Sequence, residues 1–180
     1  MILHPAPAVH ILDMMDCIDM IAYHVGRRDE VPNQELAAIL AKDENRKGID
    51  EISGYLNDKN KSIQSDCIKV LYEIGYVAPH LIAKHAQAFI SQLDSRVNRM
   101  VWGAMIALST IAKEVHQIIW PHREKIKELI ENGSVITNVC GVRTLINLSK
   151  SGDSFYDGLI DRRPAATPPG LQIRAHCSLC

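Results

Sequence analysis

LNDKNKSIQSDCIKVLYEIG, the sequence from Leu56 to Gly75, decides the fold. Its apolar positions are spaced by 4, 3, 1 and 3 residues, which places them on one face of a helix; they are Ile63, Cys67, Val70, Leu71 and Ile74. Asp58 and Asn60 are expected to form the preceding turn. We expect Gly75 to end the helix, because glycine adopts positive φ without a steric penalty. The stretch therefore predicts an amphipathic helix over 61–75.

The same pattern returns downstream and indicates internal repetition. In residues 95–112 the 4, 3, 1, 3 spacing recurs 34 residues later, at Val97, Val101, Ala104, Met105 and Leu108. A second set of apolar residues recurs at a shift of 37 residues. Ile52 and Leu56 align with Phe89 and Leu93. Ile82, Phe89 and Leu93 align in turn with Ile119, Ile126 and Ile130. A period in the high thirties is typical of arrays of paired helices.

The remaining periodicity predicts the other helices of such an array. We expect a capping helix over 8–24, with Asp13, Asp16 and Asp19 on its polar side and Gly26 at its end. Further helices are predicted over 30–43, 43–56, 80–93, 135–149 and 153–161, and one that opens at Trp120-Pro121. Prolines exclude a helix after Arg163. The predicted domain is 1–163, followed by a proline-rich tail, 164–180.

From about residue 45 to 160 the pattern resembles the HEAT-repeat family, best in 56–75. The resemblance implies an all-α fold, a right-handed α-α superhelix of about four helical pairs behind an N-terminal capping helix. Proteins of this family mostly act as scaffolds for protein partners. Smaller branches resemble DNA-alkylation glycosylases and bilin lyases, and no catalytic motif of either branch is present in this sequence.

Composition narrows the classes of partner. The formal net charge is −1 and aromatic residues make up 5% of the chain, so a nucleic-acid partner is not expected. No apolar run approaches the length of a membrane span, and the N-terminus lacks the basic region of a signal peptide. The five cysteines suggest a reducing, cytoplasmic setting.

The second helices of such an array are expected to line its concave face. Aligning them at the shift of 37 gives two columns of outward residues, called here the second-helix columns: Asp50, Gln87 and Glu124, and then Gly54, Ser91 and Glu128. The columns are polar to acidic, which suggests a groove for a basic or amphipathic protein segment. An ordinary solvated face is the simpler interpretation of the same residues.

Other candidate sites have a structural explanation that we prefer. His85 and His122 fall in register, but no further ligand completes a zinc site. Cys177 and Cys180 form a CxxC at the end of the chain, without the helix that activates such thiols. Trp102 and Trp120 suit packing better than base binding, with Glu124 as the only nearby carboxylate. We therefore expect no metal, no cofactor and no catalytic residue.

Three functions of different classes remain. The preferred one is a non-enzymatic interaction scaffold that binds a partner protein segment on the concave face. The second is a HEAT-like enzyme, either a glycosylase or a bilin lyase. A glycosylase would need a basic groove with exposed aromatic residues. The third is a structural fragment whose last repeat stacks on more solenoid, on another subunit or on a second copy of the chain. It would show uncovered apolar residues after position 134.

Overall fold

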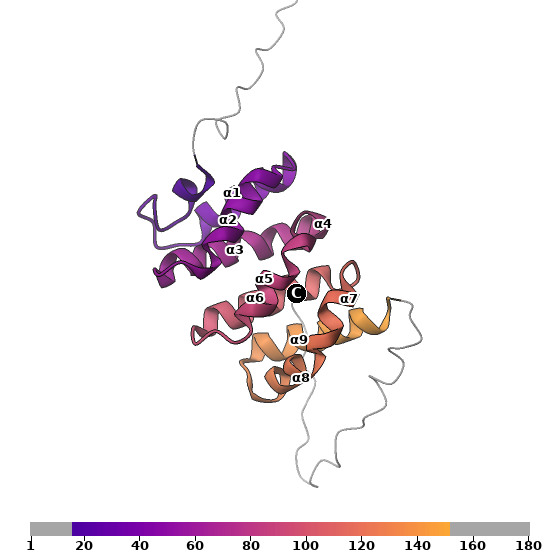
Figure 1. Cartoon of the computed structure of the whole chain (residues 1–180). Coiled ribbons are helices and arrows are strands. Elements are labelled where there is room, and N and C mark those ends of the chain that lie inside the picture. Colours follow the sequence, from indigo (N-terminus) through magenta and orange to yellow (C-terminus); the bar gives the residue numbers. More distant parts are fainter. Residues whose placement is uncertain (1–15, 152–180) are drawn as a thin grey trace, which may run out of the picture.

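A computed structural model describes residues 16–151, and these residues are helices joined by short turns, without a β-strand. The prediction of an all-α fold is confirmed for this range. Figure 1 shows the elements following one another from α1 at one end to α9 at the other. The predicted helix 153–161 and the tail 164–180 lie outside the described residues. No helix between residues 16 and 151 has the length and apolar character that a bilayer crossing requires.

The α-helices and the intervening 3-10 helices, labelled η, follow in this order: η2 Cys17–Met20, α1 Val31–Lys42, α2 Arg46–Gly54, η3 Tyr55–Asn57, α3 Lys61–Val77, α4 Pro79–Ile82, η4 Ala83–His85, α5 Ala86–Gln92, α6 Asn98–Ile111, α7 His116–Ile119, η5 Trp120–His122, α8 Arg123–Asn132 and α9 Val135–Ser149. Helices α1, α3, α6 and α9 pack in succession. Helix α2 packs on α3, α5 on α6 and α8 on α9. One continuous apolar core runs between these elements.

Helices α3, α6 and α9 begin at residues 61, 98 and 135, so each starts 37 residues after the one before. The expected shift of 34 for these helices is therefore wrong by three residues. A slip of three residues is close to one helical turn and keeps nearly the same face of the helix, so apolar spacing alone did not reveal it. Cys67 thus corresponds to Ala104, and both are fully buried.

The second helices are interrupted at equivalent points. Instead of one helix over 80–93, the chain forms α4, η4 and α5, and α7, η5 and α8 repeat this order 37 residues later. Trp120 and Pro121 therefore open a 3-10 turn, and α8 begins after it. Proline suits such a turn because it has no N–H group to donate to the preceding residues.

The predicted N-terminal helix is wrong for its described part. Residues 17–20 form a 3-10 helix, and the chain then turns to Gly26, whose φ is +71°. Glu51 accepts hydrogen bonds from the N–H groups of Cys17 and Ile18, at 3.1 and 3.0 Å. This distant side chain thus satisfies the first N–H groups of the 3-10 helix. Residues 8–15 lie outside the described range.

Gly75 does not end its helix, because α3 continues to Val77. It permits close contact with α6 and α4: a Cβ atom at Gly75 would lie 2.5 Å from Thr110 Oγ1 of α6 and 2.9 Å from Ile82 Cδ1 of α4. Gly103 of α6 makes the reciprocal contact, since a Cβ atom there would lie 2.8 Å from Ile68 Cγ1. Helices α3 and α6 therefore approach each other at two points where only glycine fits.

We predict that Gly103→Ala lowers the free energy of unfolding, although alanine is the better helix former. Its helical gain of about 1 kcal/mol is offset by about 1–3 kcal/mol of overpacking against the stiff, buried Ile68. The matched control is Gly54→Ala in α2, where an added Cβ meets no atom within 4 Å. Urea unfolding should show the control unchanged or more stable. A Gly103→Ala variant as stable as the control would contradict this account of the α3–α6 contact.

Candidate functional site

The structure places all the polar residues of the second-helix columns on the surface. Asp50 lies on α2, Gln87 and Ser91 lie on α5, and Glu124 and Glu128 lie on α8; all five are exposed. The opposite sides of these helices enter the core through Ile49, Phe89 and Ile126, each fully buried. The columns therefore belong to outward faces of three second helices.

Lysines neutralise the acidic members of the columns. Lys84 Nζ lies 2.5 Å from Asp50 Oδ1, and Lys127 Nζ lies 3.0 Å from Glu124 Oε1. Lys125 Nζ lies 3.4 Å from Glu128 Oε2 and 2.9 Å from Asp94 Oδ1. The face that the sequence suggested to be acidic thus carries both charges side by side.

Two of these ion pairs join successive second helices. The Lys84–Asp50 pair connects η4 to α2, and the Lys125–Asp94 pair connects α8 to the residues after α5. Both pairs are exposed, so each contributes on the order of 0–1 kcal/mol. Their main consequence is chemical: a partner on this face meets alternating carboxylate and ammonium groups.

The histidine pair does not form a shared site. His85 Nε2 lies 3.0 Å from Asp50 Oδ1, and burial lowers the pKa of His85 while Asp50 partly opposes the shift. His122 occupies the equivalent position in η5. No group of three or more potential metal ligands occurs among residues 16–151. The Cys177–Cys180 motif lies outside that range.

The tryptophans and the described cysteines belong to the packing. Trp102 is covered by Arg99, whose guanidinium lies 5.1 Å from the ring, and Trp120 by Arg123 at 4.6 Å. Both rings pack against the core. The three cysteines within residues 16–151 are buried, and burial raises the pKa of each thiol, away from the reactive thiolate; they are Cys17, Cys67 and Cys140.

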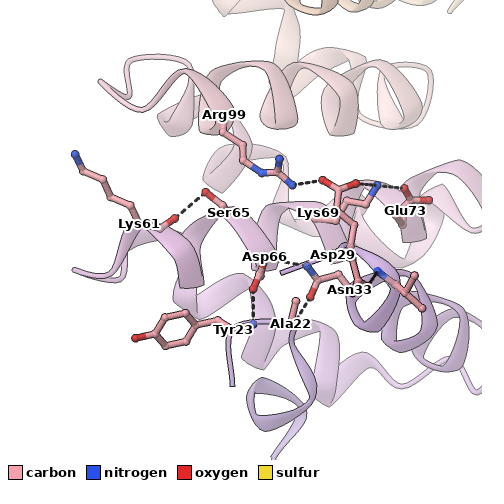
Figure 2. A network of polar contacts seen from close by, with 12 residues as sticks. Ala22, Tyr23, Asp29, Asn33, Lys61, Ser65, Asp66, Lys69, Glu73 and Arg99 are labelled. Atoms are coloured by element: carbon pink, nitrogen blue, oxygen red, sulfur yellow. Dashed lines mark hydrogen bonds and ion pairs between the residues drawn. The ribbon is translucent and has the colours of Figure 1, made fainter. Parts of the chain in front are cut away.

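Sequence reasoning missed a polar cleft of about 490 Å³ beside the first turns of α3. Its walls come from the loop before α1, from α3 and from α6; the polar residues among them include Arg27, Arg28, Glu30, Lys61, Ser65, Asp66 and Arg99. Figure 2 shows a network of polar contacts that includes several of these lining residues, among them Ser65, Asp66 and Arg99. The adjacent Arg27-Arg28 and Asp29-Glu30 pairs were the only sequence signal. Arg27 and Asp29 pair with each other, whereas Arg99, a partner of Glu30, is 69 residues away.

Asn33 and Asp66 hold the loop that forms one wall of the cleft. Asn33 is fully buried; its Oδ1 accepts from the N–H of Ala22 at 2.9 Å, and its Nδ2 donates to Asp66 Oδ1 at 2.9 Å. Asp66 Oδ2 accepts from the N–H of Tyr23 at 2.8 Å (Figure 2). These side chains satisfy the backbone N–H groups of Ala22 and Tyr23, which a continuous helix through residues 16–24 would have satisfied itself.

A cluster of charges joins α1, α3 and α6, and two of its members, Glu30 and Arg99, line the cleft. Glu30, the residue before α1, pairs with Lys69 Nζ at 2.9 Å and with Arg99 Nη2 at 2.5 Å. Lys69 is buried, and its Nζ also lies 2.6 Å from Glu73 Oε1. Burial alone would lower the pKa of Lys69, but its bonds to Glu73 and Glu30 outweigh burial and raise it. The cluster is therefore charged and internally balanced.

Two other cations that line the cleft differ from this cluster. Arg28 and Lys61 line the cleft, and neither forms an ion pair with another residue of the described range. The arrangement can thus offer donors to an anionic group while the charge cluster serves structure. Asp29 and Asp66 line the same cleft, so its overall charge is mixed.

Comparison with known proteins gives a fold-level similarity. No protein-family model matches the sequence, and no curated protein matches it. The structure is similar to the crystal structure of an engineered protein from the Northeast Structural Genomics Consortium, with a TM-score of 0.57 and 18% sequence identity. The match covers 76% of this chain and 62% of the engineered one. At this identity the similarity concerns the fold.

We predict that Asn33→Asp destabilises the protein by about 2–3 kcal/mol at neutral pH. The new carboxylate keeps the acceptor for Ala22, but it faces Asp66 at the 2.9 Å contact and loses the donor. Because like charges at this distance favour a proton shared between two carboxyl groups, the loss should become smaller in acid. The control is Asn98→Asp, at the exposed first residue of α6. Equal unfolding free energies for the two variants would refute the role given to Asn33.

A second prediction concerns acid stability. Hydrogen bonds from Arg99 and Lys69 hold the pKa of Glu30 below its ordinary value. The stability that Glu30 contributes is therefore complete above the pKa of the unfolded chain and is lost as the pH falls through the lower, folded-state pKa. Glu30→Gln should be less stable than the natural chain at neutral pH, and the difference should shrink in acid. Urea unfolding midpoints of the two proteins, measured from neutral to acid pH, give this difference in stability. The control is Glu35→Gln, at an exposed position. A difference that does not change with pH would contradict the role given to Glu30.

Proposed function

We propose that this chain is a non-enzymatic interaction module, a HEAT-like right-handed superhelix that binds a partner protein segment along its second helices. One observation carries the proposal: the polar residues of the second-helix columns are all exposed on α2, α5 and α8, while the same helices anchor in the core. A rigid row of outward helix faces is what an extended segment needs for recognition.

The regular architecture supports this proposal. Successive packing of α1, α3, α6 and α9, and the shift of 37 residues in both sets of helices, agree with a stack of paired helices. In such a stack each pair contacts only its neighbours, so one side of every second helix stays free. On this interpretation the free sides form the concave surface.

The charges of this surface refine the expected partner. Because Lys84, Lys125 and Lys127 lie beside the acids of the columns, a purely basic segment would meet cations as often as anions. We infer that the bound segment carries both charges, with basic residues opposite Asp50 and Glu124. The covered faces of Trp102 and Trp120 favour this reading over a glycosylase.

The test is a charge reversal. Full-length protein with Asp50→Lys, Glu124→Lys and Glu128→Lys should lose, by tenfold or more, the partner that the natural chain captures from its host. A control with Glu35→Lys, Glu44→Lys and Glu114→Lys changes the charge equally at exposed positions outside the columns and should keep it. Circular dichroism checks folding in each. The proposal fails if the two variants capture the partner equally.

A second candidate function is stacking of the last repeat on another subunit, including a second copy of this chain. The outer face of α9 favours it, because Val135, Val139 and Ile146 are 80%, 52% and 43% exposed. A second copy on this face would make the molar mass in light scattering rise with concentration.

A further inference from the structure

Each carboxylate that lines the polar cleft already has partners within the protein. Asp29 Oδ1 accepts from the N–H of Val31 at 3.0 Å, and its Oδ2 accepts from Arg27 Nε at 3.0 Å. Asp66 uses both oxygens in the two hydrogen bonds described above, and Glu30 uses both in its two ion pairs. None of these carboxylates therefore takes up the two remaining cations of the cleft.

These two cations reach the same cavity from different elements. Arg28 belongs to the loop before α1, and Lys61 is the first residue of α3; both are exposed and line the cleft. Neither forms an ion pair with another residue between 16 and 151, and Figure 2 shows Lys61 extending away from the polar network. Two like charges that share a cavity repel each other, and an anion bound by both removes that cost.

The cleft also offers uncharged donors. Ser62 and Tyr23 line it, and within the described range no hydrogen bond engages the hydroxyl group of either. The hydroxyl of Ser65, in contrast, donates to the carbonyl of Lys61 at 2.7 Å. An anion in the cleft would therefore meet two cations and two hydroxyl groups that have no other partner among residues 16–151.

The wall that carries Arg28 is held in place by the protein itself. The N–H of Arg27 donates to the carbonyl of Ala22 at 2.9 Å, and Arg27 Nη2 lies 2.9 Å from Asp29 Oδ2. Arg28 thus stands between two anchored residues. A wall that is ordered before binding lowers the entropic cost of taking up a ligand.

The charge and the size of the cleft select the class of ligand. A phosphate monoester carries a charge of about −1.5 to −2 at pH 7, which two cations balance, whereas a carboxylate would balance only one of them. The cleft measures about 490 Å³, within the range of about 300–1,000 Å³ that small-molecule sites occupy. It therefore has room for the organic part of an ester beside the exposed Tyr23 ring.

We propose that this cleft binds a phosphate monoester, with Arg28 and Lys61 as the charged ligands and the hydroxyl groups of Ser62 and Tyr23 as further donors. The ester is carried by a small molecule or by a phosphorylated residue of a protein segment, since the recognised group is the same in both. The lining residues come from the loop before α1, from α3 and from α6, so the site is separate from the second-helix columns. This inference does not depend on the proposed function.

The test is titration calorimetry of the full-length protein with phenyl phosphate and with benzoate. Phenyl phosphate should bind at least tenfold more tightly, because only the doubly charged group balances both cations. Arg28→Gln and Lys61→Gln should each weaken its binding by about tenfold or more, the loss expected for a charge-assisted hydrogen bond. The matched controls, Arg46→Gln and Lys47→Gln, remove the same two kinds of cation from exposed positions of α2 outside the cleft and should bind like the natural chain.

Three results would overturn the proposal: no binding of phenyl phosphate at millimolar concentration, benzoate binding as tightly as phenyl phosphate, or equal losses in the cleft and control variants. All four substitutions are at exposed positions, and circular dichroism checks that each variant is folded. A short phosphoserine peptide, titrated in the same way, identifies the carrier. Tighter binding than phenyl phosphate supports a phosphorylated protein segment and weaker binding supports a small molecule, provided that Arg28→Gln reduces both.

Discussion

The close contact between α3 and α6 is the constraint on which the remaining packing depends. Gly103 lies against Ile68, and Gly75 lies against Thr110, so the two helix axes approach as far as side chains allow. Helices α1 and α2 pack on the other side of α3, and α9 packs on the other side of α6. A change in the α3–α6 distance would therefore shift both ends of the molecule relative to each other.

Polar side chains set the second constraint, at the end of the chain that carries α1. Glu51, Asn33 and Asp66 accept hydrogen bonds from the backbone N–H groups of Cys17, Ile18, Ala22 and Tyr23, in a segment that forms a 3-10 helix and a turn. The contacts of Asn33 and Asp66 hold Ala22 and Tyr23 in the wall of the polar cleft. Asn33 and Asp66 thus serve structure, and the cations Arg28 and Lys61, which also line the cleft, form no ion pair within the described range.

The sequence pattern predicted which residues of the second helices are exposed, but it did not predict the charge of the face that they form. The shift of 37 residues between Ile52, Phe89 and Ile126 placed the exposed residues of α2, α5 and α8 correctly, because a buried position fixes the opposite side of a helix. The charge of that face was misjudged. Lys84 and Lys125 reach carboxylates 34 and 31 residues away, and such pairings depend on how the helices stack.

The sequence by itself determined the all-α class, the period of the second helices and the position of α9, because helical periodicity and turn residues are local properties. The tertiary structure alone decided four features: the shift of 37 in the first helices, the role of Gly75, the unwound segment after residue 16, and the cleft. Each depends on which distant groups meet. A shift of the alignment by about one helical turn keeps the same apolar face. The contact of a glycine depends on the helix that packs against it. A backbone N–H donates to a distant side chain only when folding brings that acceptor to within about 3 Å.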